Sequence, residues 1–556
     1  MIIDKESSKL VLLVVLDGWG MSSPGPGNAI TQANTVNMNR FWVSYPHTQL
    51  LASGESVGLP SGEVGNTETG HLNLGAGRIV YQDLLRINMS IADGIFFQNE
   101  ALIGAINHAK ENNSNLHYMG LIGAGGVHSN INHLYALIEL AKKQNFDRLF
   151  LHLFTDGRDS PPTSAKTYIS QIREVVAKEG IGQIASIMGR YWAMDRDLRW
   201  DRTSKAYFAL TEGRGELVKT PEEAIDASYA EGKTDEFITP SIIASPEGTP
   251  LATIKDNDSV VFFNFRIDRP RQLTRAFVFD DFASANLSAG FDPYQVKYQK
   301  THLPVSPVGI QAPFERGPKL KNLYFATMTE YEKQISEAGA KAAFPPENVK
   351  NPLGRIISEA GFRQLRAAES EKERFVTFYF NGQKEAPFDG EDRFIVPSPK
   401  VATYDLKPEM SAKELTDGVL ARINSVGDYK FIIMNFANAD MVGHTGNIGA
   451  AVKACTVIDE CLGKLSAWIL AYGGTMLVTA DHGNAEVMID PQTGTIDTEH
   501  NSSPVPFIAI SKSLMGRSQV LTSGILADVA PTILHILGLG IPSSMTGRNL
   551  LDSLLK

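Results

Sequence analysis

Short apolar runs recur along this 556-residue chain, and each of them ends in glycine or polar residues. Helix-like segments separate the runs, and strands that alternate with helices predict βαβ units and largely parallel sheets. The expected strands span residues 10–16, 116–122, 149–154, 184–188, 260–265, 376–380, 431–436 and 476–478. A chain of this length exceeds what one hydrophobic core organises, so we expect an α/β protein of at least two domains.

The charge and the cysteines narrow the class of protein. The formal net charge of −10 argues against a nucleic-acid-binding protein with a basic face, although local arginine clusters can still bind small anions. The run at 10–16 passes into Asp17 without a small-residue cleavage site, which favours a buried strand over a signal peptide, and we expect no membrane-crossing segment. Cys455 and Cys461 match neither a metal motif nor a disulfide framework, which predicts buried thiols in a cytoplasmic protein.

Aspartate and histidine residues follow three of the expected strands at their carboxyl ends, the edge where open α/β sheets bind ligands. Asp440 and His444 are four residues apart and share a face if this stretch forms a helical turn. Taken singly, each residue of the set also fits a turn, a helix cap or a hydrogen-bonded core histidine. The whole set favours a site for divalent ions such as Mn²⁺ or Zn²⁺, with Mg²⁺ possible. It comprises Asp17, Asp440, His444, Asp481, His482 and His500.

Arginines take the equivalent positions after the strands of the middle region. Planar guanidinium groups hold carboxylate and phosphate groups with two hydrogen bonds, so five such residues predict a small substrate with two or three negative charges. The five are Arg158, Arg190, Arg196, Arg266 and Arg269, and His128 follows another strand. Asp159 is placed to transfer a proton to substrate hydroxyl groups. The alternative is ordinary ion pairing of these arginines with Asp156, Asp195 and Asp268.

The positions of the two sets predict the domain organisation. The metal set lies before residue 81 and after residue 321, and the arginine set lies between them. We therefore expect residues 1–81 and 319–556 to form one domain, with residues 82–318 inserted as a second. The connections near 81–82 and 313–322 are expected to act as hinges. The proline-containing stretch 280–321 predicts a linker in its later half and a surface insertion at 287–298.

The Gly-rich stretch 61–78 adds a hydroxyl group to these sets. Thr67 lies in its middle between small and polar residues, and the following residues can continue as a helix. A hydroxyl group at the start of a helix faces the positive end of the helix dipole, which favours a phosphoryl group. Alone, the stretch is better explained as a surface turn with a capping threonine, and only the other two sets of residues reverse that preference.

Together these motifs resemble the cofactor-independent phosphoglycerate mutases of the alkaline phosphatase superfamily. The resemblance covers nearly the whole chain and rests on residues 17–20, 27–30, 65–71, 155–159, 189–196, 263–266, 398–405, 440–444 and 481–483. It implies an alkaline-phosphatase-like doubly wound α/β domain with a second α/β domain inserted. It also implies a monomer that interconverts 3-phosphoglycerate and 2-phosphoglycerate with two divalent ions (Mn²⁺ first, with Mg²⁺, Co²⁺ or Zn²⁺ as alternatives) and without bisphosphoglycerate.

The resemblance also implies roles for individual residues. Asp440, His444 and His500 would hold one ion, and Asp17, Thr67, Asp481 and His482 the other. The glycerate would contact His128, Arg158, Asp159, Arg190, Arg196, Arg266, Arg269 and Lys372. Catalytic roles fall to Thr67, Asp159, Arg269 and Lys372, the last of which would otherwise be interpreted as a solvated surface lysine.

One residue departs from the family pattern. The family has Ser where this chain has Thr67, which supplies the same hydroxyl group with a methyl group that restricts χ1 and crowds a phosphoryl group. We expect Thr67 to act as the nucleophile and to form a phosphothreonine. Two alternatives stay open: a metal-dependent phosphatase or mutase of another phosphorylated hydroxy acid, and a phosphometabolite-binding protein without turnover.

Overall fold

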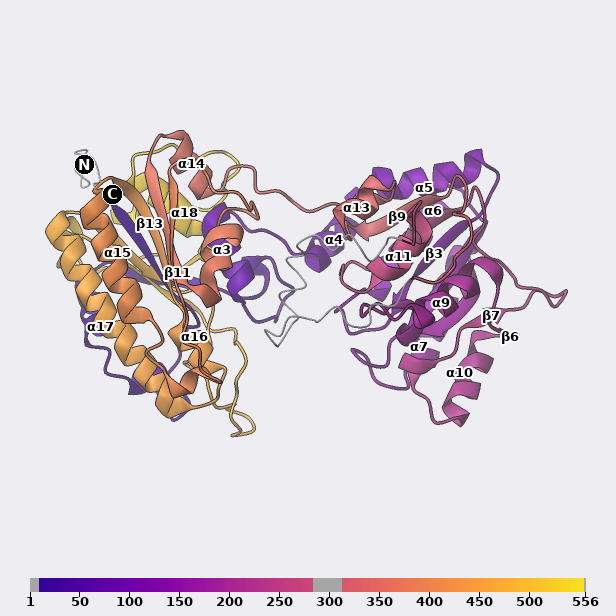
Figure 1. Ribbon diagram of the computed structural model, residues 1–556, viewed down its shortest axis with the longest axis horizontal. Coiled ribbons are helices and arrows are strands. Elements are labelled where there is room, and N and C mark those ends of the chain that lie inside the picture. The colour runs from indigo at the N-terminus through magenta and orange to yellow at the C-terminus, as the bar shows by residue number, and fades with distance from the viewer. Residues whose placement is uncertain (1–9, 284–312, 555–556) are drawn as a thin grey trace. The chain divides into compact units, whose positions relative to one another are not determined.

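The computed structural model describes residues 10–283 and 313–554 and divides the chain into two compact units (Figure 1). Unit 1 comprises Met1–Gln82 and Glu347–Lys556, and unit 2 comprises Asp83–Pro346. Each unit contains a mostly parallel sheet with helices on its faces. The predicted α/β class, with one domain inserted into another, is confirmed.

The sheet of unit 1 has the strand order β12-β11-β13-β1-β14-β15-β2-β16. The strands from β12 to β14 are parallel, whereas β15 runs antiparallel to both β14 and β2. β1 pairs with β13 on one side and with β14 on the other, so three carboxyl ends lie next to one another. The strands are β1 (Val11–Leu16), β2 (His47–Leu51), β11 (Arg363–Glu369), β12 (Glu391–Val396), β13 (Tyr429–Phe436), β14 (Thr475–Thr479), β15 (Val505–Ile510) and β16 (Gly524–Ile525).

Helices cover both faces of this sheet. α15 (Ala412–Val426) and α17 (Ile448–Tyr472) lie side by side on one face, and α3 (Thr67–Ala76) lies with α14 (Leu353–Glu359) and α18 (Val529–Ile536) on the other (Figure 1). Unit 1 also contains α1 (Ala29–Gln32), α2 (Val36–Ser44) and α16 (Asn438–Gly443). All six side chains of β1 are fully buried, and burying each such Leu or Val contributes about 1.5–3 kcal/mol. The first apolar run is therefore the centre of the core.

Unit 2 has a second sheet, with the order β10-β9-β8-β3-β4-β5-β7-β6, in which β7 runs antiparallel to β5. Its strands are β3 (Leu116–Ile122), β4 (Leu149–Thr155), β5 (Gln183–Gly189), β6 (Glu216–Val218), β7 (Ser241–Ile243), β8 (Ser259–Phe262), β9 (Tyr324–Thr329) and β10 (Lys341–Phe344). Its helices are α4 (Asp83–Ala92), α5 (Glu100–Glu111), α6 (Ile131–Lys143), α7 (Ala165–Glu179), α8 (Arg190–Ala193), α9 (Trp200–Glu212), α10 (Pro221–Ala230), α11 (Pro270–Val278) and α13 (Lys333–Glu337).

Alternate residues of the strands in unit 2 enter two separate hydrophobic clusters. Leu151 and Leu153 of β4 pack with α5, α6, α7 and α10, whereas Phe154 packs with α9 and α11. Val261 and Phe262 of β8 divide in the same way. This alternation explains why the runs are apolar throughout, because both faces of the sheet are covered.

The structure corrects two predictions. The inserted unit continues to Pro346 instead of ending at 318, because β9 pairs with β8 and β10 pairs with β9 in the sheet of unit 2. The stretch 376–380 is not a strand: residues Phe375–Tyr379 form a π-helical turn, and β11 occupies the place beside β13. A short apolar run fits a buried turn of helix as well as a strand. The surface insertion at 287–298 and most of the proposed linker lie outside the described residues.

The strand and cysteine expectations are confirmed within the described residues. The run at 10–16 is a buried parallel strand, and Cys455 and Cys461 are buried in α17. No helix in the part of the chain that the structure describes is long and apolar enough to cross a membrane.

Glu369, the last residue of β11, supplies a test of the packing. Its side chain is fully buried and its Oε1 accepts the Ser411 N–H at 2.9 Å; burial raises the pKa of Glu369 from 4.5 to about 7. Between pH 4.5 and 7 the folded chain therefore holds a proton that the unfolded chain has released, so the free energy of unfolding falls as pH rises. We expect Glu369→Gln to remove this slope and to raise stability at neutral pH by on the order of 3 kcal/mol.

Denaturant titrations of both proteins at several pH values check this expectation. Glu359→Gln, at an exposed glutamate of α14 that pairs with Arg355, is the control and should leave the slope unchanged. If the free energy of unfolding changed with pH equally in the unsubstituted protein and in Glu369→Gln, the assignment of this pH dependence to Glu369 would be contradicted.

Candidate functional site

Three buried carboxylates lie at the adjacent carboxyl ends of β1, β13 and β14. Asp17 follows β1 and its N–H donates to the Phe436 carbonyl of β13 at 3.1 Å. Asp440 lies in α16, which begins two residues after β13, and Asp481 lies two residues after β14. Each is at most 2% exposed. The parallel sheet thus brings together residues that are more than four hundred positions apart in the chain.

Thr67 is the first residue of α3 and its hydroxyl group lies among these carboxylates. Asn66 caps the helix, since its side chain accepts the Thr69 N–H at 3.0 Å. Thr67 Oγ1 lies 2.9 Å from His482 Nε2 and 3.4 Å from Asp17 Oδ1. The threonine is therefore not the capping residue, and its buried hydroxyl group sits at the positive end of the helix.

Lys372 places an ammonium group between the carboxylates and the hydroxyl group. Its Nζ donates to Asp17 Oδ1 and Asp440 Oδ2, both at 2.7 Å, and to Thr67 Oγ1 at 3.2 Å. Burial disfavours the charged amine, but Asp17, Asp440 and Asp481 raise the pKa of Lys372 above its ordinary value. The residue is 3% exposed, so the interpretation as a surface lysine is wrong.

Histidines complete the cluster. His482 is fully buried, and although burial opposes its charge, Asp481 and the other carboxylates raise its pKa to about 9. His500 Nε2 lies 3.1 Å from both Asp440 Oδ1 and His444 Nε2. His444 lies 3.2 Å from Asp440 Oδ1 and is partly exposed, and its pKa is raised by Asp440 against the effect of burial.

The donor set fits divalent cations. Ligand atoms of Asp440, His482 and His500 all lie within 4.8 Å of one another, and so do those of Asp17, Asp481 and His482. Lys372, at a pKa above its ordinary value, offsets one of the three carboxylate charges. The pKa values of Asp440 and Asp481 are held below the ordinary range by Lys372 and neighbouring histidines, against the effect of burial. Mixed carboxylate and imidazole donors suit ions such as Mn²⁺ or Zn²⁺.

Two buried residues that the sequence interpretation did not single out support the cluster. Asn435 of β13 donates from Nδ2 to Asp17 Oδ2 at 2.8 Å. Glu486 Oε2 accepts the N–H groups of Gly20 at 2.9 Å and Asn484 at 3.0 Å, which joins the loops after β1 and β14. A Cβ at Gly20 would lie 2.2 Å from this carboxyl group, so a larger residue there would displace the Glu486 side chain from these two N–H groups. The sequence signal for Asn435 is a polar residue inside the apolar run 431–436.

Unit 2 gathers the predicted arginines at the carboxyl ends of its own strands. A cavity of about 140 Å³ is lined by Arg158, Arg190, Arg196 and Arg269, together with Tyr191, Met194, Asp195, Asp197, Arg202 and Glu236. This volume equals about five waters at roughly 30 Å³ each. Arg266 and His128 do not line it, but both lie near Asp268, which also pairs with Arg196.

The alternative of internal ion pairs also holds for part of the arginine set. Arg190 Nη1 lies 2.5 Å from both Asp156 Oδ1 and Asp159 Oδ2, and Arg196 Nη1 lies 2.6 Å from Asp268 Oδ2. The Nε groups of Arg190 and Arg269 are nevertheless buried without a hydrogen-bond partner among the described residues. Buried cationic donors of this kind favour an added anion.

The electrostatics around Asp159 keep its carboxyl group ionised. Burial opposes its ionisation, but the hydrogen bond and charge of Arg190, with His128 and Arg269, hold the pKa of Asp159 below its ordinary value. Burial and the surrounding arginines lower the pKa of His128 to about 3 and that of Arg269 to about 10. At neutral pH Asp159 is thus a carboxylate and His128 a neutral ring, 3.8 Å apart.

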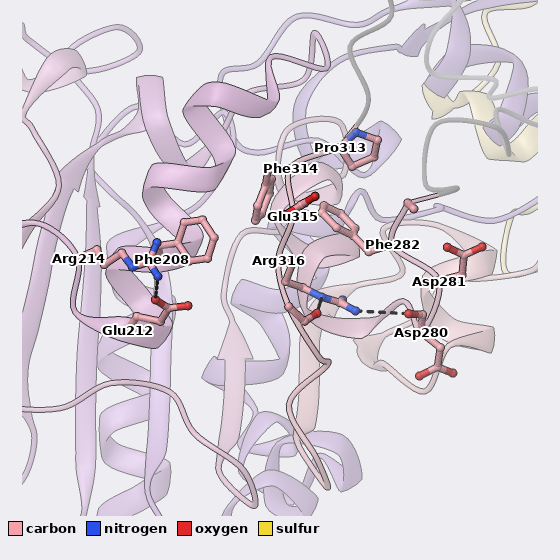
Figure 2. Close-up of a pocket in the computed structure, with 12 residues that line it drawn as sticks. Phe208, Glu212, Arg214, Asp280, Asp281, Phe282, Pro313, Phe314, Glu315 and Arg316 are labelled. Carbon is pink, nitrogen blue, oxygen red and sulfur yellow. Dashed lines mark hydrogen bonds and ion pairs between the residues drawn. The ribbon is translucent and has the colours of Figure 1, made fainter.

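A larger cavity of about 670 Å³ lies elsewhere in unit 2, beside the end of α9 (Figure 2). Phe208, Phe282 and Phe314 face it, with the guanidinium groups of Arg214 and Arg316 over two of the rings. None of the predicted site residues lines this cavity. Cavity size therefore does not identify the site, whereas the clustered charges do.

Comparisons with known proteins agree with these two clusters. The family model described as "BPG-independent PGAM N-terminus" matches residues 87–333, within unit 2. The 2,3-bisphosphoglycerate-independent phosphoglycerate mutase of Moorella thermoacetica is 50% identical over 97% of this chain and 98% of its own length. The enzyme of the same name from Clostridium novyi is 50% identical over 98% of this chain and 99% of its own.

The chain belongs to the 2,3-bisphosphoglycerate-independent phosphoglycerate mutase family. Among solved structures, that of Leishmania mexicana phosphoglycerate mutase at low cobalt concentration matches with a TM-score of 0.58 and 28% identity, covering 98% of both chains. The mutase fold is thus shared over both units. The family resemblance predicted from the motifs is confirmed, and the individual residue roles stay predictions.

The Arg190–Asp156 pair supplies a test of the second cluster. Both side chains are nearly fully buried, so Asp156→Asn would leave the guanidinium with one carboxylate partner fewer and lower the free energy of unfolding by about 3 kcal/mol. Asp226→Asn, at an exposed ion pair with Lys166, is the control and should cost less than about 1 kcal/mol. Denaturant unfolding of both variants measures this, and equal losses would contradict a special role for the buried pair.

Proposed function

We propose that this protein interconverts 3-phosphoglycerate and 2-phosphoglycerate by two phosphoryl transfers, through a phosphothreonine at Thr67 and without bisphosphoglycerate. The observation that carries the proposal is the buried Thr67 hydroxyl group at the start of α3, within 3.5 Å of His482, Asp17 and Lys372. The names and near full-length similarity of the mutase relatives support the same reaction.

The proposed metal ligands are Asp440, His444 and His500 for one ion and Asp17, Thr67, Asp481 and His482 for the other. The short distances among their ligand atoms support this assignment, and His482 is close to both groups. We propose Mn²⁺ as the ion, with Mg²⁺, Co²⁺ and Zn²⁺ as alternatives; the similar Leishmania mexicana mutase was crystallised at low cobalt concentration. When bound, two divalent ions would lower the pKa of a hydroxyl group and offset the charge of a phosphoryl group.

Thr67 would act as the nucleophile. Its Oγ1 would pass its proton to Asp17 Oδ1, the acceptor 3.4 Å away, and attack the substrate phosphorus in line, so that the bond to the glycerate oxygen breaks as the bond to Oγ1 forms. Lys372 holds its ammonium group 3.2 Å from Oγ1, where it offsets charge on the transferring oxygens. The buried groups around Thr67, His482 and Lys372, would hold its hydroxyl group in place for the attack.

Glycerate would be held by the arginine set while Thr67 carries the phosphoryl group. The proposed substrate contacts are His128, Arg158, Asp159, Arg190, Arg196, Arg266, Arg269 and Lys372. Asp159, a carboxylate at neutral pH, would first take up a proton from solvent, then give it to the leaving alkoxide and recover one from the other hydroxyl group in the return transfer. Retention of glycerate separates a mutase from a phosphatase, because water that reached the phosphothreonine would release phosphate.

The family relationship also supports a monomer that works in the cytoplasm. The substrate class is a small phosphorylated hydroxy acid, and the net charge of −10 gives no support for nucleic-acid binding.

Variants of Thr67 test the proposal. We expect Thr67→Val, which replaces the hydroxyl group with a methyl group, to lower kcat by at least about 10⁴-fold, and Thr67→Ser to retain turnover. Thr69→Val is the matched control on the same helix, since Thr69 is also buried but bonds only within its own turn. The measurement is formation of 2-phosphoglycerate coupled to enolase, with Mn²⁺ and with no bisphosphoglycerate.

A chelator should abolish turnover in the same assay. Release of glycerate and free phosphate would instead identify a phosphatase. Full activity of Thr67→Val would contradict the proposed nucleophile.

A further inference from the structure

His71 and Asn435 form a buried bridge between two carboxylates of one metal group. Asn435 Nδ2 lies 2.8 Å from Asp17 Oδ2 and 3.1 Å from His71 Nε2. On the other side of the ring, His71 Nδ1 lies 3.2 Å from Asp481 Oδ2 and 3.0 Å from the Thr67 carbonyl oxygen. The path from Asp17 to Asp481 therefore runs through two side chains that are both fully buried.

The chemistry of these neighbours fixes the state of the bridge. Nδ1 of His71 faces a carboxylate and a carbonyl oxygen, both acceptors, so it carries the proton. Nε2 is then the lone-pair nitrogen and accepts from Asn435. The amide of Asn435 must turn its nitrogen to Asp17, because its oxygen there would face a carboxylate.

This orientation has a cost in stability. Asn435 Oδ1 is buried and has no hydrogen-bond partner among the described residues. A buried carbonyl oxygen without a partner is unfavourable, so the amide is held by its contacts to Asp17 and His71. A pair that served packing alone would be replaced at no loss by apolar side chains.

We propose that His71 and Asn435 are positioning residues that hold Asp17, Asp481 and the first turn of α3 in one fixed arrangement. The bridge joins three strands and a helix, because Asn435 belongs to β13, Asp17 follows β1, Asp481 follows β14 and His71 belongs to α3. It sets the direction of both carboxylates toward one ion and the place of Thr67 beside them. The inference rests on the proposed metal site and adds two residues to it.

Two substitutions of His71 separate the halves of the bridge. His71→Asn keeps an N–H near the place of Nδ1 and loses the acceptor for Asn435, whereas His71→Gln keeps an acceptor near the place of Nε2 and loses the donor to Asp481. Asn435→Ala removes both of its donors. His133→Asn is the matched control, since His133 is another buried helix histidine paired with an asparagine, with Nε2 2.8 Å from Asn88 Oδ1 in unit 2.

The experiment titrates each full-length protein with Mn²⁺ and follows binding by electron paramagnetic resonance, with thermal unfolding of the metal-free protein alongside. We expect two ions per wild-type chain. In His71→Gln and Asn435→Ala, one Mn²⁺ dissociation constant should rise by about 10–100-fold while the other stays unchanged. In His71→Asn the same dissociation constant should rise by a smaller factor. The double variant His71→Gln/Asn435→Ala should bind Mn²⁺ no more weakly than either single variant, because both substitutions break the same bridge.

Kinetics supply the second readout. At saturating Mn²⁺, kcat of His71→Gln should fall while KM for 3-phosphoglycerate stays unchanged, because the arginine set lies in unit 2. His133→Asn should lower thermal stability and leave both constants and kcat unchanged.

Unchanged Mn²⁺ constants and kcat in His71→Gln and Asn435→Ala would overturn the proposal. An equal rise of both Mn²⁺ dissociation constants in proportion to the loss of thermal stability would also overturn it, since that result indicates a structural role. A wild-type chain without bound Mn²⁺ and without mutase turnover would overturn the proposed function itself.

Discussion

Burial of three carboxylates at one edge of a sheet is the constraint on which the rest of unit 1 depends. Asp17, Asp440 and Asp481 are each at most 2% exposed, and isolated charges in such a place cost several kcal/mol each. Lys372 contacts two of them, and His71 and His482 lie beside the third, Asp481. The remaining negative charge is what suits the cluster to divalent cations.

The sheet topology puts the charges together before any side chain is considered. β1 lies between β13 and β14, and all three are parallel, so the loops after them leave the sheet at the same edge. The apolar runs that form these strands secure the register. Unit 2 uses the same construction with the opposite charge, because arginines follow β4, β5 and β8.

Local sequence patterns predicted those features of the fold and the site that depend on residues close together in the chain. Apolar runs followed by Asp, His or Arg located the strands that carry both clusters, and the motifs located the family. Lys372 lies in a short turn after β11 and has no local pattern that distinguishes it from a surface lysine. The prediction of a strand at 376–380 was wrong because an apolar run does not distinguish a strand from a buried turn of helix. The predicted end of the inserted unit at 318 was wrong because the pairing of β9 with β8 and of β10 with β9 decides where the unit ends. Both strands are distant in the chain from β3.

Mapping the phosphoryl group on the enzyme tests the central claim most directly. The protein is mixed with 2-phosphoglycerate and Mn²⁺, quenched within one turnover and cleaved with trypsin, which leaves Thr67 in the peptide from Phe41 to Arg78. Fragmentation mass spectrometry should place a phosphoryl group on Thr67, and rapid addition of glycerate before the quench should remove it. A phosphoryl group on another residue, or rapid turnover with no labelled peptide, would contradict the account.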